Sequence, residues 1–273
     1  MSDITVNQEN KRPTMAKDFA MDLPITAPFD WLRRGVQDTF TSPISSLAYG
    51  FAVFLVSIAF VVALLKFGFS YILFPVIASF MVLGPMVAIG LYGKSRLLAL
   101  GSQHITITDM ISVKAKSPKA LMLVSIVLLF VMTFWLRAAV MIYALFFGLE
   151  PFSGVEETIN ALLFTDTGRI MLLVGSIAGG ALAALSFSLS AFSLPMLMNE
   201  KKDTMTAMAL SVVIAWMNKP VAFLWGTIVL GFFLLSFATG FLGLIVIFPI
   251  LGHATWHAYT DLRSDEALAA ANP

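Results

Sequence analysis

The chain has 273 residues, of which 59% are hydrophobic and 12% are charged, with a net charge of +1 and a mean hydropathy of +0.89. Ordinary soluble proteins are about 45–50% apolar and about 25% charged, so the composition excludes that class and indicates a protein of the lipid bilayer. The absence of cysteine excludes disulfides, thiolate metal sites and cysteine nucleophiles. The net charge of +1 carries no information about nucleic acid, and no nucleic-acid partner is predicted.

The chain begins with a polar stretch, residues 1–29, which we expect to be a disordered cytoplasmic tail. Apolar runs follow, each long enough to cross about 30 Å of hydrocarbon, which takes about 20 helical residues. The six runs are residues 46–65, 67–93, 119–148, 170–198, 221–238 and 241–259. Because lipid offers the backbone no hydrogen-bond partner, each run must be helical. The predicted fold is an all-α integral membrane protein, with a six-helix transmembrane domain over residues 30–260 and a second cytoplasmic tail at 261–273.

A pattern recurs three times along this domain. A short stretch with apolar residues at helical spacing is followed by Pro43, Pro118 or Pro220, and a hydrophobic run then begins. Proline ends a preceding helix and fits the first turn of the next one. The pattern predicts three repeats of an interfacial helix plus a transmembrane hairpin, at about 30–96, 105–198 and 203–260. Such repeats are typical of transporters, whose sites lie where repeats meet, and equally of an inert bundle built by duplication.

The basic residues are distributed unevenly between the two sides of the predicted bundle. Fourteen lie on the side of the N-terminus: Lys11, Arg12, Lys17, Arg33, Arg34, Lys94, Arg96, Lys114, Lys116, Lys119, Lys201, Lys202, Lys219 and Arg263. Only Lys66 and Arg169 lie on the other side. Cytoplasmic loops carry the excess of Lys and Arg. We therefore expect a multi-pass protein of the bacterial cytoplasmic membrane with both termini in the cytoplasm.

One charge interrupts a predicted span. Arg137 lies about ten residues, or roughly 15 Å, from the outer end of its run, near the bilayer midplane. An intramembrane arginine is a functional-site hypothesis by default, and here the role would be binding an anionic group. The structural alternative is hydrogen bonding to backbone carbonyls, to Thr133 or to a serine of the fourth run.

The fourth run is rich in small residues. Gly175, Gly179 and Ala183 recur every four positions, and small residues at this spacing let helices approach closely in lipid. The pattern predicts helix packing at the centre of the bundle, with a homodimer interface as the functional alternative.

Two histidines, His253 and His257, stand four positions apart near the C-terminus. On a helix they share one face, so both imidazoles could bind one metal ion. Two ligands make no secure site, although His104 lies on the same predicted side. Trp256 and Tyr259 in the same segment favour interfacial anchoring, and proton or substrate handling is a further alternative. No cofactor is predicted.

Four segments together resemble the bacterial integral membrane protein family catalogued as domain of unknown function 2189. They are 83-LGPMVAIGLY-92, 193-SLPMLMNEKKDTMTAMALS-211, 218-NKPVAFLWG-226 and 252-GHATWHAY-259, and the resemblance runs from about Asp30 to Tyr259. Arg137, His253 and His257 match positions of the family's pattern. The resemblance implies a bacterial inner-membrane protein with six spans, and it implies no mechanism.

These observations favour a non-enzymatic accessory or scaffold component of a membrane assembly. The alternative is a solute or lipid transporter with a site near Arg137 at the repeat interface, and the third hypothesis is a membrane metalloprotein using His253 and His257. The expected partners are the lipid bilayer and either another membrane protein or further copies of this chain.

Overall fold

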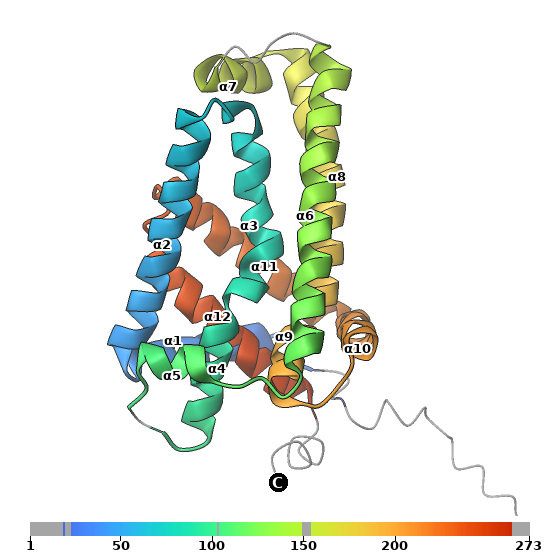
Figure 1. Cartoon of the computed structure of the whole chain (residues 1–273). Helices are drawn as coiled ribbons and strands as arrows, with labels where there is room; N and C mark the ends of the chain where they lie inside the picture. The colour runs from blue at the N-terminus through green and yellow to red at the C-terminus, as the bar shows by residue number, and fades with distance from the viewer. Residues whose placement is uncertain (1–18, 20–22, 103, 149–153, 264–273) are drawn as a thin grey trace, which may run out of the picture.

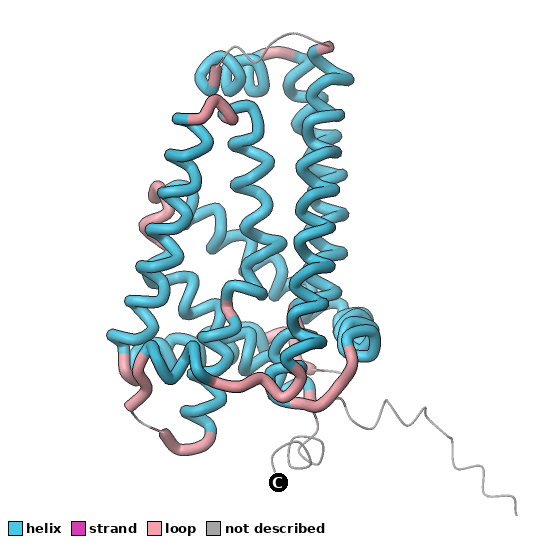
Figure 2. The backbone as a smooth tube through the Cα atoms, viewed as in Figure 1, coloured by secondary structure: helices cyan, strands magenta, loops and turns pink. Residues whose placement is uncertain are grey.

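The computed structural model describes residues 19, 23–102, 104–148 and 154–263, and within these ranges the chain is helical (Figures 1 and 2). The helices are α1 (Ala27–Phe40), α2 (Pro43–Lys66), the short 3-10 helix η2 (Ser70–Ile72), α3 (Leu73–Val87), α4 (Ile89–Ala99), α5 (Ile107–Ser112), α6 (Pro118–Phe147), α7 (Val155–Phe164), α8 (Asp166–Ser190), α9 (Ser193–Asn199), α10 (Thr204–Met217), α11 (Lys219–Ala238) and α12 (Leu244–Leu262). Most of the two predicted terminal tails lies outside the described residues.

Two upright hairpins, α2 with α3 and α6 with α8, define the long axis of the molecule (Figure 1). The short helix α7 lies across one end, which we call the top. The helices α1, α5 and α10 lie at the opposite end, which we call the base. A third hairpin, α11 with α12, is inclined to the upright pair and reaches the base through the second half of α12.

The predicted breaks occur at the three prolines. Pro43, Pro118 and Pro220 occupy the first or second position of α2, α6 and α11, where the missing N–H is not needed. At the first break, Ser42 adopts the left-handed conformation with φ of 64°. This turn lets α1 lie along the base while α2 rises from it (Figure 2).

By length and composition, five segments can cross a membrane. They are Pro43–Lys66, Ser70–Ala99, Pro118–Phe147, Asp166–Asn199 and Lys219–Ala238. The sixth predicted span forms α12, which is not among these five segments. Nine of the 19 residues of α12 are buried. The reason is the polar second half of α12, where His253, His257 and Asp261 face neighbouring helices instead of lipid.

The helix α12 packs closely against α1 and α2. A Cβ atom on Gly35 of α1 would lie 2.6 Å from the carbonyl oxygen of Ile250, and one on Gly50 of α2 would overlap the carbonyl oxygen of Ile245. Both contacts require glycine because the helix backbones nearly touch. One turn earlier on α1, the fully buried Trp31 ring packs edge-on against Trp225 of α11, with 5.7 Å between centroids.

The small residues of α8 do not place that helix at the centre. Only 6% of its most apolar window is buried, the lowest fraction among the five segments. Gly179 receives the ring of Trp135 from α6, whereas a Cβ on Gly175 would meet no atom within 4 Å. Along one face of α8, the small residues therefore give close packing at Gly179 and open space one turn away at Gly175.

Candidate functional site

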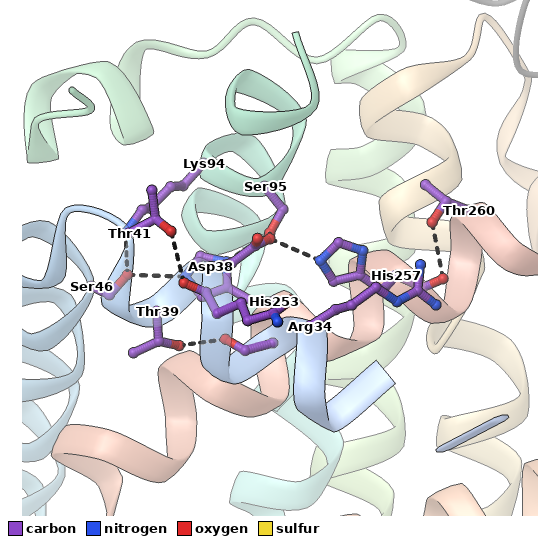
Figure 3. Close-up of polar contacts among 12 residues, drawn as sticks. Arg34, Asp38, Thr39, Thr41, Ser46, Lys94, Ser95, His253, His257 and Thr260 are labelled. Carbon is purple, nitrogen blue, oxygen red and sulfur yellow. Dashed lines mark hydrogen bonds and ion pairs between the residues drawn. The ribbon is translucent and has the colours of Figure 1, made fainter. Parts of the chain in front are cut away.

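A group of hydrogen-bonded side chains lies at the base, where α1, α2, α4 and α12 meet (Figure 3). We call it the base cluster, and its members are Asp38, Ser46, Lys94, Ser95, His253 and His257. Four of them, Ser46, Lys94, Ser95 and His253, are at most 1% exposed. The side chains of Asp38 and His257 keep 16% and 17% of their surface, so the cluster has one edge near solvent.

His253 occupies the middle of the base cluster. Its Nε2 atom lies 3.0 Å from Ser46 Oγ, and its Nδ1 atom lies 2.8 Å from Ser95 Oγ. Lys94 donates to Ser46 Oγ at 2.7 Å and to the carbonyl oxygen of Ser42 at 3.0 Å. A buried amine is therefore tied to the left-handed turn between α1 and α2 and to the histidine of α12.

Asp38 forms the solvent edge together with His257. Its Oδ2 atom accepts from Ser95 Oγ at 2.5 Å and lies 2.9 Å from His257 Nε2. Burial by itself would raise the pKa of the Asp38 carboxyl, but the hydrogen bonds from His257 and Ser95 and the charge on His257 outweigh burial and hold that pKa below its ordinary value. The carboxylate form is thus the one that the cluster stabilises.

Acid is expected to weaken the fold through Asp38. Because the pKa of Asp38 is lower in the folded protein, its contribution to stability is full above pH of about 4 and is lost as pH falls through the lowered pKa. Asp38→Asn should lower the free energy of unfolding at neutral pH by about 1–3 kcal/mol and flatten its acid dependence. Thermal unfolding across pH measures both effects.

Asp30 provides the control for this experiment, because it lies on the same helix with its side chain 61% exposed and pairs only with Arg33 among the described residues. Asp30→Asn should change the free energy of unfolding at neutral pH by at most about 1 kcal/mol, because exposed ion pairs contribute little. Equal effects of the two substitutions would contradict the assigned role of Asp38.

The two histidines that the sequence singled out lie in one cluster but do not face a common metal position. Both ring nitrogens of His253 are engaged by serines, and His257 Nε2 points at Asp38. Among the described residues no three His, Cys, Asp or Glu side chains converge as metal ligands would. The pair therefore acts through hydrogen bonds in this structure.

A second buried polar group lies beside the base cluster. Arg263 donates from Nε and Nη2 to the two carboxylate oxygens of Glu200, at 2.8 and 2.7 Å. Tyr259 Oη donates to Glu200 Oε1 at 2.6 Å, and Asn199 Nδ2 donates to Tyr259 at 3.3 Å. Both charged side chains are at most 6% exposed, so this ion pair joins the end of α9 to the end of α12 away from water.

Above the base, a cavity of about 1630 Å³ separates the three hairpins. Residues from α2, α3, α6, α8, α11 and α12 line it, and Gly175, Gly179 and Ala183 of α8 are among them. Small-molecule pockets usually measure about 300–1,000 Å³. The space is therefore large enough for a ligand with long chains.

Most of the serine and threonine hydroxyls along this cavity are turned back to their own helices. Seven of them donate to the backbone carbonyl four residues earlier: Ser57, Ser79, Thr158, Ser188, Thr227, Ser236 and Thr255. The indole N–H of Trp135 likewise donates to the carbonyl of Pro75 at 2.9 Å. Because these groups are already satisfied, they present a mainly apolar wall.

Arg137 lies outside this cavity. It is exposed on α6, and no hydrogen bond or ion pair joins it to another described residue. The hydrogen bond from Trp135 to Pro75 places these two residues at a similar height on α6 and α3. Since α3 descends from Ser70 and α6 rises, at 1.5 Å per residue Arg137 lies roughly 5 Å below Ser70 along the long axis. Arg137 therefore lies near the upper end of the α2–α3 hairpin and not at the middle of that hairpin. The helix α6 is longer and extends above this end (Figure 1).

Sequence reasoning did not identify the partners of the histidines. Asp38, Ser46 and Lys94 are 48 to 219 positions away from the residues that they contact. Charged and hydroxyl side chains are common in loops, in interfacial helices and at the ends of spans, so their residue types alone do not indicate that they contact the histidines. The available signal was that Asp38 and Lys94 fall on the same predicted side as the histidines.

Comparisons with known proteins agree with this architecture. No curated protein and no solved structure matches the chain. Residues 73–199, from the first residue of α3 to the last residue of α9, match a family model. The match includes Arg137 and the small residues of α8, and it ends before His253 and His257. It confirms the resemblance that the sequence motifs indicated: residues 73–199 are similar to the family described as predicted integral membrane protein (DUF2189).

Proposed function

We propose that this integral membrane protein binds a lipid, or another long apolar molecule, in the cavity between its three hairpins. The observation that carries the proposal is the apolar cavity of about 1630 Å³. Seven of its serine and threonine hydroxyls are committed to backbone carbonyls, so a polar solute would find few free partners along the wall. An acyl chain needs no hydrogen-bond partner. The proposed role is binding, without an enzymatic step.

We also propose that α12 is a sixth crossing and that the base is cytoplasmic. The excess of basic residues on the base supports this orientation, and the hairpin of α11 and α12 supports a return of the chain to the side where α10 lies. Both termini would then be cytoplasmic, as expected for a multi-pass protein of a bacterial inner membrane.

The position of Lys219 supports a ligand with an anionic headgroup. Lys219 is the only charged residue among the described residues that line the cavity, and its ammonium group lies 3.7 Å above the Trp216 ring. Both residues are exposed at the junction of α10 and α11, at the base. Tryptophan is typical of the membrane interface, where a lipid phosphate lies. The chains of such a lipid would extend from Lys219 into the cavity.

Filling the cavity tests this function. Gly175 and Gly226 both line the cavity, and a Cβ on either would meet no atom within 4 Å. Gly175→Leu and Gly226→Leu should therefore fold while displacing the ligand, and native mass spectrometry of protein released from nanodiscs should show less bound lipid.

Gly231→Leu is the matched control, because Gly231 lies on α11 with equally open surroundings and does not line the cavity. Its bound lipid should equal that of the wild type. Retention of lipid by both cavity variants at the level of this control would contradict the proposal.

A second candidate function is the accessory role in a membrane assembly, and Arg137 favours it. This cation is exposed on α6 between Phe134 and Met141, which are both 64% exposed. A charge at a lipid-facing position is costly unless a partner covers it. A partner helix with a carboxylate at this level would satisfy it, and Arg137→Leu should then release a co-purifying subunit without unfolding the protein.

A further inference from the structure

The hydrogen bonds of the base cluster have a single consistent direction. An ammonium group can only donate, so Ser46 accepts from Lys94, which leaves its own O–H available to donate to His253 Nε2. At the other end a carboxylate can only accept, so Ser95 turns its O–H to Asp38 Oδ2 and must accept from His253 Nδ1. For a neutral ring, the carboxylate end therefore assigns one tautomer to His253, with the proton on Nδ1 and with Nε2 accepting from Ser46.

We propose that this directed chain is a proton relay, through which the buried Lys94 exchanges its proton with water at the Asp38 edge. In one step, Lys94 gives a proton to Ser46, Ser46 gives its own to His253 Nε2, Nδ1 gives its proton to Ser95, and Ser95 gives its own to Asp38. Each N–H or O–H bond that breaks is matched by one that forms. The step ends with neutral Lys94, neutral Asp38 and the Nε2–H tautomer of His253.

The geometry meets the requirements of such a relay. All four links from Lys94 to Asp38 measure 2.5–3.0 Å, which is within hydrogen-bond reach for proton transfer. The inner members are at most 1% exposed, whereas the Asp38 side chain keeps 16% of its surface and borders a cavity of about 620 Å³ at the base. Water can therefore take the proton only at the Asp38 end.

The charged and titratable groups around the relay are few among the described residues. Asp38 and Arg34 come from α1, Lys94 from α4, and His253, His257 and Asp261 from α12, while α2 contributes the hydroxyl of Ser46. His104 borders the cavity beside Asp38. Arg34 is paired with Asp261, which also accepts a hydrogen bond from Trp31. This ion pair is therefore not a member of the proposed relay.

The first test is the tautomer of His253 in the wild type. In protein labelled with ¹⁵N-histidine and held in nanodiscs, the nitrogen shifts at neutral pH should show a neutral ring with the proton on Nδ1. His253→Gln assigns the signal by its loss. A ring protonated on Nε2, or on both nitrogens, would overturn the directed chain.

The second test is the rate at which the Lys94 ammonium exchanges protons with water, measured by NMR on ¹⁵N-lysine protein. His253→Gln keeps an acceptor for Ser46 and a donor for Ser95 but cannot exchange tautomers, and Asp38→Asn removes the terminal acceptor. Both should slow exchange on the order of 100-fold, the lower range for a positioned proton-transfer group. Asp261→Asn, outside the chain, should leave the rate unchanged.

The direction of the change separates a relay from a packing role. If the cluster only held the helices together, weakening it would open the site more often and speed the exchange of Lys94. Unchanged or faster exchange in both His253→Gln and Asp38→Asn, with thermal unfolding showing folded protein, would therefore overturn the relay. The outcome does not depend on what fills the large cavity.

Discussion

Glu200→Ala is expected to lower the free energy of unfolding by about 3–5 kcal/mol, because it removes the carboxylate that is paired with a buried guanidinium. Arg263 makes two bonds to the Glu200 carboxylate, and the Arg263 side chain is only 4% exposed. Tyr259 also loses the acceptor for its hydroxyl. Reversible unfolding in mixed detergent micelles, or steric trapping in bicelles, measures the loss.

The top of the molecule supplies the control for this prediction. Asp166 and Arg169 form an ion pair at 2.6 Å whose side chains are 91% and 61% exposed, and exposed pairs contribute at most about 1 kcal/mol. Asp166→Ala should therefore lower the free energy of unfolding by at most about 1 kcal/mol. If Glu200→Ala cost no more than Asp166→Ala, the buried pair would not hold α9 and α12 together as the structure indicates.

Gly50→Ala is expected to destabilise the protein by about 1–3 kcal/mol, the usual cost of overpacking. The added methyl group would overlap the carbonyl oxygen of Ile245, and the neighbouring oxygen of Leu244 lies 2.9 Å from the same position. Backbone atoms cannot turn aside as a flexible side chain can, so α2 and α12 must separate. The same unfolding assay reports the effect.

Gly231→Ala should instead raise the free energy of unfolding. A Cβ at Gly231 meets no atom within 4 Å, and the residue lies inside α11, where alanine stabilises a helix by roughly 0.5–1 kcal/mol relative to glycine. Destabilisation by Gly50→Ala together with stabilisation by Gly231→Ala is the expected result. A shared sign would show that helix propensity, and not the contact between α2 and α12, determines the response.

The helices themselves could be predicted from the sequence because lipid imposes a simple rule. Long apolar runs must be helical, and the prolines at 43, 118 and 220 mark where three of these helices begin. The rule became ambiguous for α12, whose first half is apolar and whose second half carries the polar residues of the base. Periodicity alone does not distinguish a polar face turned to water from one turned to other helices.

The site was predictable only in part, for a related reason. His253 and His257 were singled out by their spacing, and the structure places them in one cluster. Their hydrogen-bond partners come from three other helices, and a single sequence carries no signal for pairings across such distances. On α8, the ring of Trp135 packs against Gly179, whereas the space at Gly175 belongs to the cavity.

The most direct test of the proposed function is an experimental density map of the wild-type protein in lipid nanodiscs, at a resolution that shows acyl chains. The expected result is continuous elongated density in the cavity between the three hairpins, with a headgroup near Lys219 at the base. A cavity closed by movement of α8 or α11 towards α3, or one filled by ordered water, would contradict the account.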